Sequence, residues 1–281
     1  MQSEFYKIYR KFYNYLSGRG LRKYSTLKSF NNFIASKINF ATVYGHEMYF
    51  PEHYRNLLTT GLYDPFETSF YENQIKNGDI VIDIGANIGI FTLLFAKLVG
   101  SNGHVYAFEA DPTNFEILKK NIEINSYQNT TLENKAIFHK NEKINLFLSP
   151  SNPGDHRIYD SNDGRKSIQI NSIILDDYIL QKKVDVDFVK IDVQGSELSV
   201  IQGMKKLLEP NNIKIMMEFE PILLEKFGTK PLDLLDILES YGFHFFDINE
   251  IEQKIKHISI SELISKYNTK NGNRTNLFLE K

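Results

Sequence analysis

The chain has 281 residues, of which 42% are hydrophobic, enough apolar material for one large domain or for one domain with an appendage. Its net charge of −2 gives no argument for nucleic-acid binding, and the lack of cysteine excludes disulfides, a thiolate nucleophile and thiolate-bound zinc. The chain contains no uninterrupted apolar run near ~18 residues and no signal-peptide pattern. We therefore expect no transmembrane helix, and we predict a cytoplasmic protein.

Residues 1–37 are basic and aromatic, with eight lysines and arginines against the single acid Glu4. The spacing predicts two helices, over 4–17 and 25–37, separated by a glycine-rich break. Such helices either pack their aromatic side chains on the main domain or lie on an anionic membrane surface. We favour packing on the main domain, and we keep peripheral membrane contact through residues 1–37 as the alternative.

The next segments lead up to the first buried strand. Residues 41–50 alternate around a glycine like a small hairpin, residues 52–60 have a helical pattern, and residues 61–65 break it. We predict an N-terminal helical and hairpin appendage over 1–77, which acts as a lid, a cap or an oligomerisation element. The second domain then covers residues 78–281.

The second domain opens with a strand, a glycine turn, a helix and a second strand. Residues 80–82 form an apolar strand, 85–89 form a small-sided turn, and 90–99 form an apolar helix. The strand over 105–108 then ends on Glu109. This arrangement places bare backbone at a helix N-terminus and a carboxylate where it can accept hydrogen bonds from a ribose diol.

The turn is unsuited to a dinucleotide. A pyrophosphate site needs G-x-G-x-x-G, whereas the run Gly85-Ala-Asn-Ile-Gly89 lacks the middle glycine and follows an acid, Asp83. A ligand with an ammonium group and a ribose but no phosphate fits this pattern. S-adenosylmethionine is such a ligand, and D-x-G-x-x-x-G followed by an acid resembles the class I methyltransferase pattern. A glycine turn in some other α/β domain is the plain alternative.

The rest of the chain alternates between helices and strands. Helices are predicted from Asp111-Pro112 to Ile122 and over 175–180, 197–208 and 231–241, and strands over 130–138, 144–148, 168–173, 186–193, 213–219, 243–248 and 276–279. This order predicts an α/β fold with a mostly parallel sheet and helices on both faces. The last strand follows a long connection, which suits antiparallel insertion. Residues 143–180 are predicted to be an insertion around the polar loop Ser149–Lys166.

Five stretches together resemble one family, the FkbM-type methyltransferases. They are Gly61–Thr68, Gly78–Gly89, Val105–Pro112, Asn152–Tyr159 and Val186–Glu197. They span about residues 45–250, so the first 40 residues lie outside the resemblance. It implies a class I, Rossmann-like fold with a seven-stranded sheet, S-adenosylmethionine as cofactor, and methylation mostly of hydroxyl groups on sugars, lipopolysaccharide components or polyketides. One departure is Ala110, where a proline is common.

The candidate cofactor-binding residues lie at strand ends and in the glycine turn. Asp83 and Asn87 are expected to order polar contacts around the methionine part, Glu109 to bind the ribose, and Ala136 to flank the adenine. The full set is Asp83, Gly85, Ala86, Asn87, Gly89, Glu109, Ala110, Ala136 and Asp192.

A hydroxyl acceptor must lose a proton, which requires a base or a cation near the reacting oxygen. His156 is the first candidate, because an imidazole titrates near neutral pH and Asp155 is placed to orient it. Asp192 and Glu218, at the ends of predicted strands, are the other candidate catalytic residues. The position of Glu197 in the first turn of a helix is explained as well by the helix dipole alone.

A metal site is left open by the sequence. Asp192, Glu218 and Glu220 are oxygen ligands of the type that Mg²⁺ prefers, but acids at strand ends are also ordinary surface residues.

Three other functions compete with O-methylation of a saccharide, glycolipid or similar small molecule. N-methylation of a small molecule or peptide would not need His156. An inactive binding or scaffold domain is disfavoured by the intact Asp83, Gly85, Gly89 and Glu109 set, and a dinucleotide oxidoreductase by the missing glycine. The identity of the acceptor does not follow from the sequence, and a homo-oligomer stays open.

Overall fold

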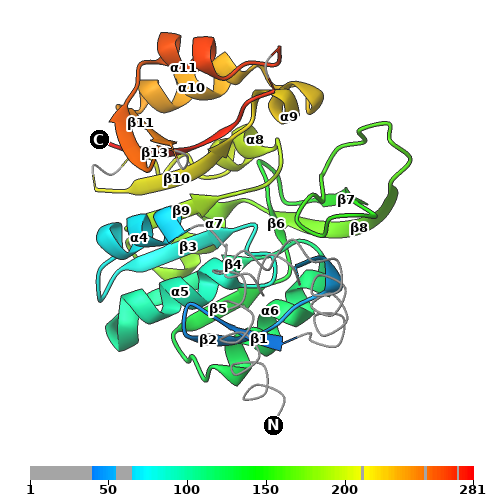
Figure 1. Ribbon diagram of the computed structural model, residues 1–281, viewed down its shortest axis with the longest axis vertical. Helices are drawn as coiled ribbons and strands as arrows, with labels where there is room; N and C mark the ends of the chain where they lie inside the picture. Colours follow the sequence, from blue (N-terminus) through cyan, green and yellow to red (C-terminus); the bar gives the residue numbers. More distant parts are fainter. Residues whose placement is uncertain (1–39, 55–64, 210–211, 250–251, 271) are drawn as a thin grey trace, which may run out of the picture.

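The computed structural model describes residues 40–54, 65–209, 212–249, 252–270 and 272–281 (Figure 1). The central sheet is built from β3 (Ile80–Ile84), β4 (His104–Phe108), β5 (Thr130–Glu133), β9 (Phe188–Ile191), β10 (Lys214–Phe219), β11 (His244–Asn249), β12 (Lys254–His257) and β13 (Thr275–Glu280). The helices are α4 (Pro65–Gln74), α5 (Ile90–Val99), α6 (Pro112–Ile124), α7 (Leu175–Lys182), α8 (Glu197–Gln202), α9 (Pro221–Lys226), α10 (Pro231–Ser240) and α11 (Ile260–Lys266).

The central sheet has eight strands in the order β12-β11-β13-β10-β9-β3-β4-β5. The five strands from β10 to β5 run parallel, and β13 pairs antiparallel with both β10 and β11. The predicted α/β fold and the antiparallel last strand are confirmed. The eighth strand, β12, lies at the edge and was not predicted, because all four of its residues are exposed and give no apolar signal.

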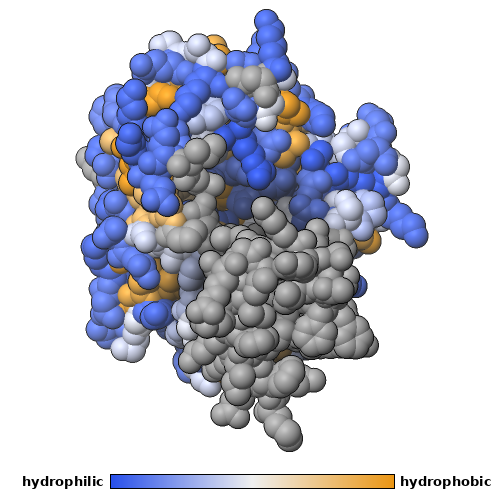
Figure 2. Space-filling view, viewed as in Figure 1, coloured by the Kyte–Doolittle hydropathy of each residue, from blue (hydrophilic) through white to orange (hydrophobic). Residues whose placement is uncertain are grey.

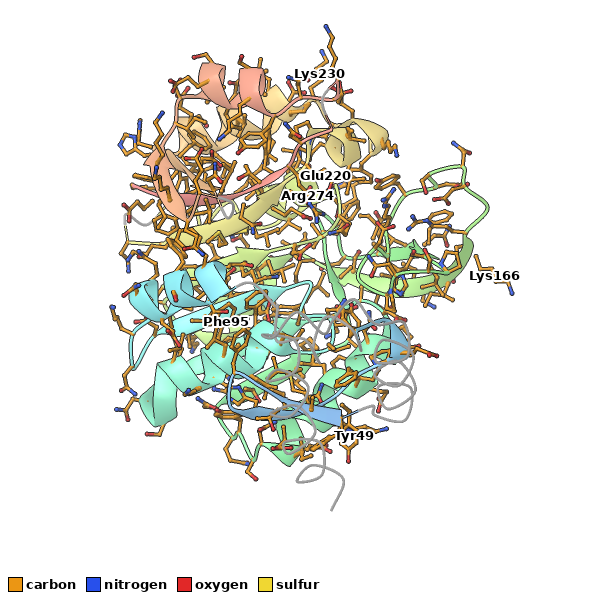
Figure 3. The ribbon with its side chains drawn as sticks, in the orientation of Figure 1. Tyr49, Phe95, Lys166, Glu220, Lys230 and Arg274 are labelled. Atoms are coloured by element: carbon orange, nitrogen blue, oxygen red, sulfur yellow. The ribbon has the colours of Figure 1, made fainter. Side chains whose placement is uncertain are left out.

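Strand alternation sends the side chains of the central strands to the two faces of the sheet. On one face, α4 and α5 cover Val81, Phe188 and Met216. Tyr71, fully buried on α4, meets the rings of Phe91 and Phe95 at centroid distances of 5.2 and 4.9 Å; Figure 3 labels Phe95. The aromatic side chains of α4 and α5 therefore cover one face of the sheet.

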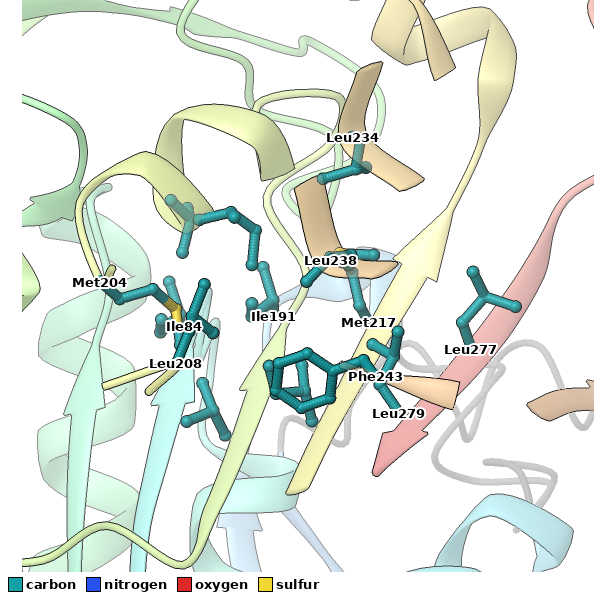
Figure 4. Close-up of a cluster of buried hydrophobic side chains, with 14 of the residues drawn as sticks. Ile84, Ile191, Met204, Leu208, Met217, Leu234, Leu238, Phe243, Leu277 and Leu279 are labelled. Atoms are coloured by element: carbon teal, nitrogen blue, oxygen red, sulfur yellow. The ribbon is translucent and has the colours of Figure 1, made fainter. Parts of the chain in front are cut away.

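The other face holds the larger core. Met204, Leu208, Met217, Leu238 and Leu279 belong to one buried cluster, which α7, α8 and α10 close (Figure 4). Ile82 and Ile84 point to this face and Val81 to the other, as expected for a strand buried on both sides. The outward surface seen in Figure 2 is mainly hydrophilic over its described part.

Several predicted elements end or begin elsewhere. The strand predicted over 130–138 is broken at Asn134, whose side-chain amide donates to the carbonyl groups of Glu109 and Ala110 at 2.8 and 3.2 Å. The helix predicted over 197–208 ends at Gln202. Helices α9 and α11 were not predicted; α11 begins with a capping box between Ser259 and Glu262.

Two smaller sheets flank the central one. β6 (Ala136–Ile137), β7 (Lys143–Leu148) and β8 (Lys166–Ile173) form a three-stranded sheet in the order β6-β8-β7, which projects from the body of the molecule (Figure 1). The predicted hairpin is present as β1 (Phe40–Val43) and β2 (His46–Tyr49). The Asn121 side chain on α6 fastens this hairpin by accepting from the Tyr49 backbone N–H at 2.7 Å.

The predicted helices over 4–17 and 25–37, and most of the one over 52–60, lie outside the described residues; residues 52–54 form a short 3₁₀ turn. The division at residue 77 stays a prediction. Within the described ranges, no helix has both the length and the apolar character needed to cross a bilayer.

Candidate active site

A cavity of about 360 Å³ opens where the parallel strands end. Ligands of open α/β sheets bind at this edge. We divide its lining into a β4–β5 half, formed by Phe108, Glu109, Ala110, Ala136 and Ile137, and a β9–β10 half, formed by Lys190, Asp192, Gln194, Glu218 and Arg274. The glycine turn after β3 lies between the two halves.

Most of the predicted site residues meet in this cavity. Those that line it are Gly85, Ala86, Asn87, Glu109, Ala110, Ala136, His156, Asp192 and Glu218. Asp83, Gly89 and Glu220 are not among its lining residues.

Every backbone N–H of the turn 85–89 has an acceptor inside the protein. The carbonyl group of Phe108 accepts two of them at 3.0 Å, the Glu109 carboxylate accepts that of Asn87 at 2.7 Å, and the other two bond within the turn. A phosphate cradle needs free N–H groups. The turn therefore supplies shape rather than donors, which argues against a pyrophosphate.

The two glycines of the turn serve packing. Gly85 has φ +78°, and a Cβ there would lie 1.9 Å from the carbonyl oxygen of Asp192. Gly89 has φ +90°, and its Cβ would meet Leu118 of α6 at 2.5 Å. Gly85 thus brings the ends of β3 and β9 together, while Gly89 seats α5 against α6. Gly89 is not among the residues that line the cavity, and its predicted contact with the cofactor stays a prediction.

Asp83 lies beneath the cavity floor and not in its wall. Its carboxylate is fully buried and accepts the Thr92 hydroxyl at 2.6 Å, while Oδ1 has no hydrogen-bond partner among the described residues. Burial raises the pKa of Asp83, and the Lys190 ammonium, 3.8 Å from Oδ1, opposes that rise. The role predicted for Asp83 in ordering contacts around the methionine part stays a prediction; in the structure the neighbour of its carboxylate on the cavity side is Lys190.

Glu109 is the most firmly held acid of the β4–β5 half. One carboxylate oxygen accepts from the Asn87 N–H at 2.7 Å and the other from the Asp111 N–H at 2.8 Å. Burial raises the pKa of Glu109 to about 7, although both N–H groups lower it. Each oxygen keeps a further lone pair, so the carboxylate can still accept two hydroxyl groups.

A loop closes the cavity over Asn87. The Asn87 side chain accepts the Tyr54 hydroxyl at 2.8 Å, and its amide faces the carbonyl of Pro153 at 3.4 Å. Asn114 of α6 donates to the same carbonyl at 3.0 Å. Tyr54 and Asn114 were not predicted as site residues; they come from the 3₁₀ turn 52–54 and from α6, which carry no local signal for this contact.

His156 lies in the wall, but its partners differ from those expected. Its Nδ1 accepts from the Ser149 N–H at 3.0 Å, so the ring proton is on Nε2, which lies 3.4 Å from Oδ2 of Asp111. Asp155 pairs with Arg157 and Arg165 instead. Both imidazole nitrogens are thus engaged within the protein. This geometry gives His156 a part in holding the loop and disfavours it as a base.

One side-chain amide links the two acids of the β9–β10 half. Nε2 of Gln194 donates to Asp192 at 2.9 Å and to Glu218 at 2.8 Å, and Gln194 adopts a left-handed φ of +55°. Arg274 lies 3.0 Å from Glu218 and 3.4 Å from Glu220 (Figure 3). Burial and the charge of Asp192 raise the pKa of Glu218 well above its usual range.

Lys190 is the buried cation of this half. It is 5% exposed, and its Nζ lies 3.7 Å from Asp192 Oδ2 and 5.3 Å from the centroid of the Phe91 ring. Burial lowers its pKa, but the carboxylates of Asp192 and Asp83 outweigh burial and raise it. Lys190 therefore stays an ammonium. The sequence placed it in a strand and gave it no role.

The acids of this half do not fit Mg²⁺. Glu218 and Glu220 are already paired with Arg274, and Asp192 faces Lys190. A cation would have to displace these side chains to gain the several oxygen ligands that it needs. Among the described residues no cluster of three or more metal-ligating side chains is found.

Comparison with known proteins decides the family. The model of the FkbM methyltransferase domain matches residues 83–245, which is more than half of the chain and contains the glycine turn, Glu109, Lys190 and Glu218. The chain belongs to the FkbM methyltransferase domain family.

Individual relatives of this FkbM domain are distant. It is 25% identical to Methyltransferase 1 of Beauveria bassiana over 144 residues, 44% of this chain and 57% of that protein. It is 28% identical to the hexuronic acid methyltransferase AglP of Haloferax volcanii over 146 residues, 51% of this chain and 57% of that protein. The matches thus span little more than half the length of these relatives.

A solved structure that is similar to this chain is also a distant match. The methyltransferase FkbM from Methylobacillus flagellatus aligns with a TM-score of 0.42 and 16% identity, over 81% of this chain and 53% of that one.

Proposed function

We propose that this FkbM domain transfers a methyl group from S-adenosylmethionine to a hydroxyl group of a saccharide, glycolipid or similar small molecule. The observation that carries the proposal is the division of one cavity into two chemically different halves. The β4–β5 half presents a buried carboxylate between apolar walls, and the β9–β10 half presents ion-paired acids at the next strand ends.

The residues of the cavity fit S-adenosylmethionine. Glu109 has lone pairs for the two ribose hydroxyls, and Phe108 and Ile137 provide apolar walls for an adenine. The turn 85–89 offers no free N–H for a phosphate, and this ligand has none. The β9–β10 half carries two carboxylates, Asp192 and Glu218, beside two cations, and the half-exposed Asp192 is available to an ammonium group of the ligand. When bound, the cofactor supplies an electrophilic methyl group.

We assign the acceptor proton to Asp192. Its Oδ1 is held by Gln194, while its side chain is 40% exposed and Oδ2 faces the cavity beside Lys190. A carboxylate fixed on one oxygen and open on the other is suited to take a proton from a bound hydroxyl. Glu218 supports it from β10 through the same Gln194 amide. His156, in this proposal, positions the loop that covers the cofactor.

The saccharide part of the proposal has one external support. A relative over about half the chain is a hexuronic acid methyltransferase. We propose a glycan or other small molecule as acceptor, no Mg²⁺ and a cytoplasmic location. Membrane contact through residues 1–37 concerns residues outside the described ranges and stays a prediction.

The cofactor is tested first, by calorimetric binding of S-adenosylhomocysteine, with NAD⁺ as the control ligand. Binding of the adenosyl ligand alone is expected. Binding of NAD⁺ alone, or of neither ligand, would overturn the proposal.

The reaction is tested with S-[methyl-³H]adenosylmethionine and a panel of hexosides, uronic acids and lipid-linked sugars. Asp192→Asn is expected to slow transfer by about 10²-fold or more, because it removes the base, while S-adenosylhomocysteine still binds. His156→Ala is the comparison: it should weaken S-adenosylhomocysteine binding and keep the pH dependence of transfer. The assignment of the base fails if His156→Ala abolishes that pH dependence and Asp192→Asn does not. Transfer to amines alone would favour N-methylation.

A further inference from the structure

Lys190 has an unusual environment for a buried ammonium. None of the hydrogen bonds found among the described residues uses its Nζ, and its two carboxylate neighbours lie at 3.7 and 3.8 Å, beyond hydrogen-bond distance. Asp83 Oδ1, on the opposite side, is buried without a hydrogen-bond partner. Buried polar groups are nearly always hydrogen-bonded. The lysine also lines the cavity, so a molecule bound there lies next to its side chain.

An oxygen atom that lies beside the Lys190–Asp192 pair, and not between the two groups, can contact both of them. Two hydrogen bonds of about 2.8 Å from a shared atom span the 3.7 Å between Nζ and Oδ2. An atom placed there must accept from an ammonium and donate to a carboxylate. A hydroxyl group does both, whereas a carboxylate would be repelled by Asp192 and an ammonium by Lys190.

We propose that Lys190 is a catalytic residue: its ammonium and the Asp192 carboxylate together hold the acceptor hydroxyl, and the ammonium stabilises the oxygen as its proton leaves. This inference rests on the proposed methyl transfer and deepens it.

The step balances without a further reactant. The acceptor O–H bond breaks and its proton goes to Asp192 Oδ2. The oxygen electron pair forms the new O–CH₃ bond while the S–CH₃ bond breaks, and its electron pair stays on sulfur. Lys190 keeps its protons throughout and supplies the positive charge that a metal ion supplies in metal-dependent chemistry.

The charges around Lys190 come from four elements of the fold. Asp83 faces it from β3, Glu67 from α4, Asp192 follows it on β9, and Glu218 lies on β10. These acids keep the lysine charged. They also bring the cation next to the expected position of the sulfonium, so Lys190 and the sulfonium should repel each other.

That repulsion gives a test that needs no acceptor. The affinities of S-adenosylmethionine, which carries the sulfonium, and of S-adenosylhomocysteine, which does not, are measured by calorimetry for the wild type, K190M and K190R. In K190M the preference for S-adenosylmethionine should rise roughly tenfold, because a nearby positive charge is gone. K190R should keep the wild-type preference. K97M, on the exposed side of α5, is the control for loss of a lysine.

Methyl transfer is the second readout, measured with the glycoside that the wild type methylates fastest. K190M should lower turnover by about 10²–10³-fold and shift the pH profile to higher pH, and K190R should recover part of the turnover. K190M leaves Asp83 without its cation, so the D83N/K190M variant repeats both measurements with both charges removed.

Two results would overturn the proposal. One is an equal loss of affinity for both ligands in K190M that is absent for a decarboxylated S-adenosylhomocysteine, which would assign Lys190 to the methionine carboxylate. The other is a folded D83N/K190M variant with wild-type ligand preference and turnover. If the wild type methylates no hydroxyl, the proposed function fails, while the ligand preference still decides the placement of Lys190.

Discussion

The two halves of the cavity are built in different ways. In the β4–β5 half, Glu109 is held by two backbone N–H groups at 2.7 and 2.8 Å, and both come from residues within 22 positions of it. In the β9–β10 half, side chains hold one another, from Lys190 to Arg274, at 2.8 to 3.7 Å. Backbone donors fix a group more rigidly than long side chains do. The first half is suited to an invariant ligand and the second to a variable one.

The largest expected effect is at the junction of the halves. Gly85→Ala should destabilise the fold by about 3 kcal/mol or more, since it adds a left-handed φ penalty to a Cβ 1.9 Å from the Asp192 carbonyl. Urea unfolding measures it. Gly228→Ala is the matched control, because Gly228 has φ +90° but no atom within 4 Å of the added Cβ, so only about 1–2 kcal/mol should be lost. Equal losses would show that the close approach of β3 and β9 is unimportant.

An intermediate effect is expected in the β4–β5 half. Glu109→Gln should weaken S-adenosylhomocysteine binding by about 10- to 100-fold, because hydrogen bonds to a charged group contribute ~1.5–3 kcal/mol. In the wild type the pKa of about 7 makes affinity fall as the pH drops below 7, and the variant should lose this dependence. Calorimetry at pH 6 and 8 measures both. Glu123→Gln, on the exposed side of α6, should change neither.

The smallest effect concerns an acid under the β9–β10 half. Burial raises the pKa of Glu197 to about 7, and its Oε2 has no hydrogen-bond partner among the described residues. Between pH 4.5 and 7 the folded state therefore binds more protons than the unfolded state, and this group's contribution to stability falls as the pH rises. Glu197→Gln should stabilise the protein above pH 7 by on the order of 1 kcal/mol.

Unfolding in urea at pH 5 and pH 8 checks this difference. Glu225→Gln, exposed on α9, is the control. A stability difference between Glu197→Gln and wild type that is the same at both pH values would contradict the buried, high-pKa carboxyl.

The sequence predicted the fold where the signal is local. The glycine turn, the helix over 90–99 and the N-cap at Asp111 depend on neighbouring residues, and all three are present. The break at Asn134 and the strand β12 were missed. The first depends on carbonyl groups 24 and 25 residues away, and the second has no buried face.

The site residues show the same difference between local and long-range signals. Glu109 ends a recognisable strand, so its place in the cavity was predictable. Lys190, Gln194 and Arg274 were missed. Each has a partner on another strand, and the local sequence around each indicates only a strand, a turn or a loop. His156 was placed in the cavity wall, but its partner Asp111 is 45 positions away, whereas the adjacent Asp155 is taken by arginines.

β13 runs antiparallel to β10, and this direction affects which residues reach the proposed acceptor side of the cavity. Parallel strands bring only their last residues to the cavity edge, whereas β13 brings its beginning, so Arg274 and the connection from α11 arrive there from the opposite direction. Leu277 and Leu279 anchor the strand in the core a few residues later. Under the proposed function, insertions or exchanges before Thr275 would remodel the acceptor side without changing the β4–β5 half, which is encoded more than 130 residues earlier.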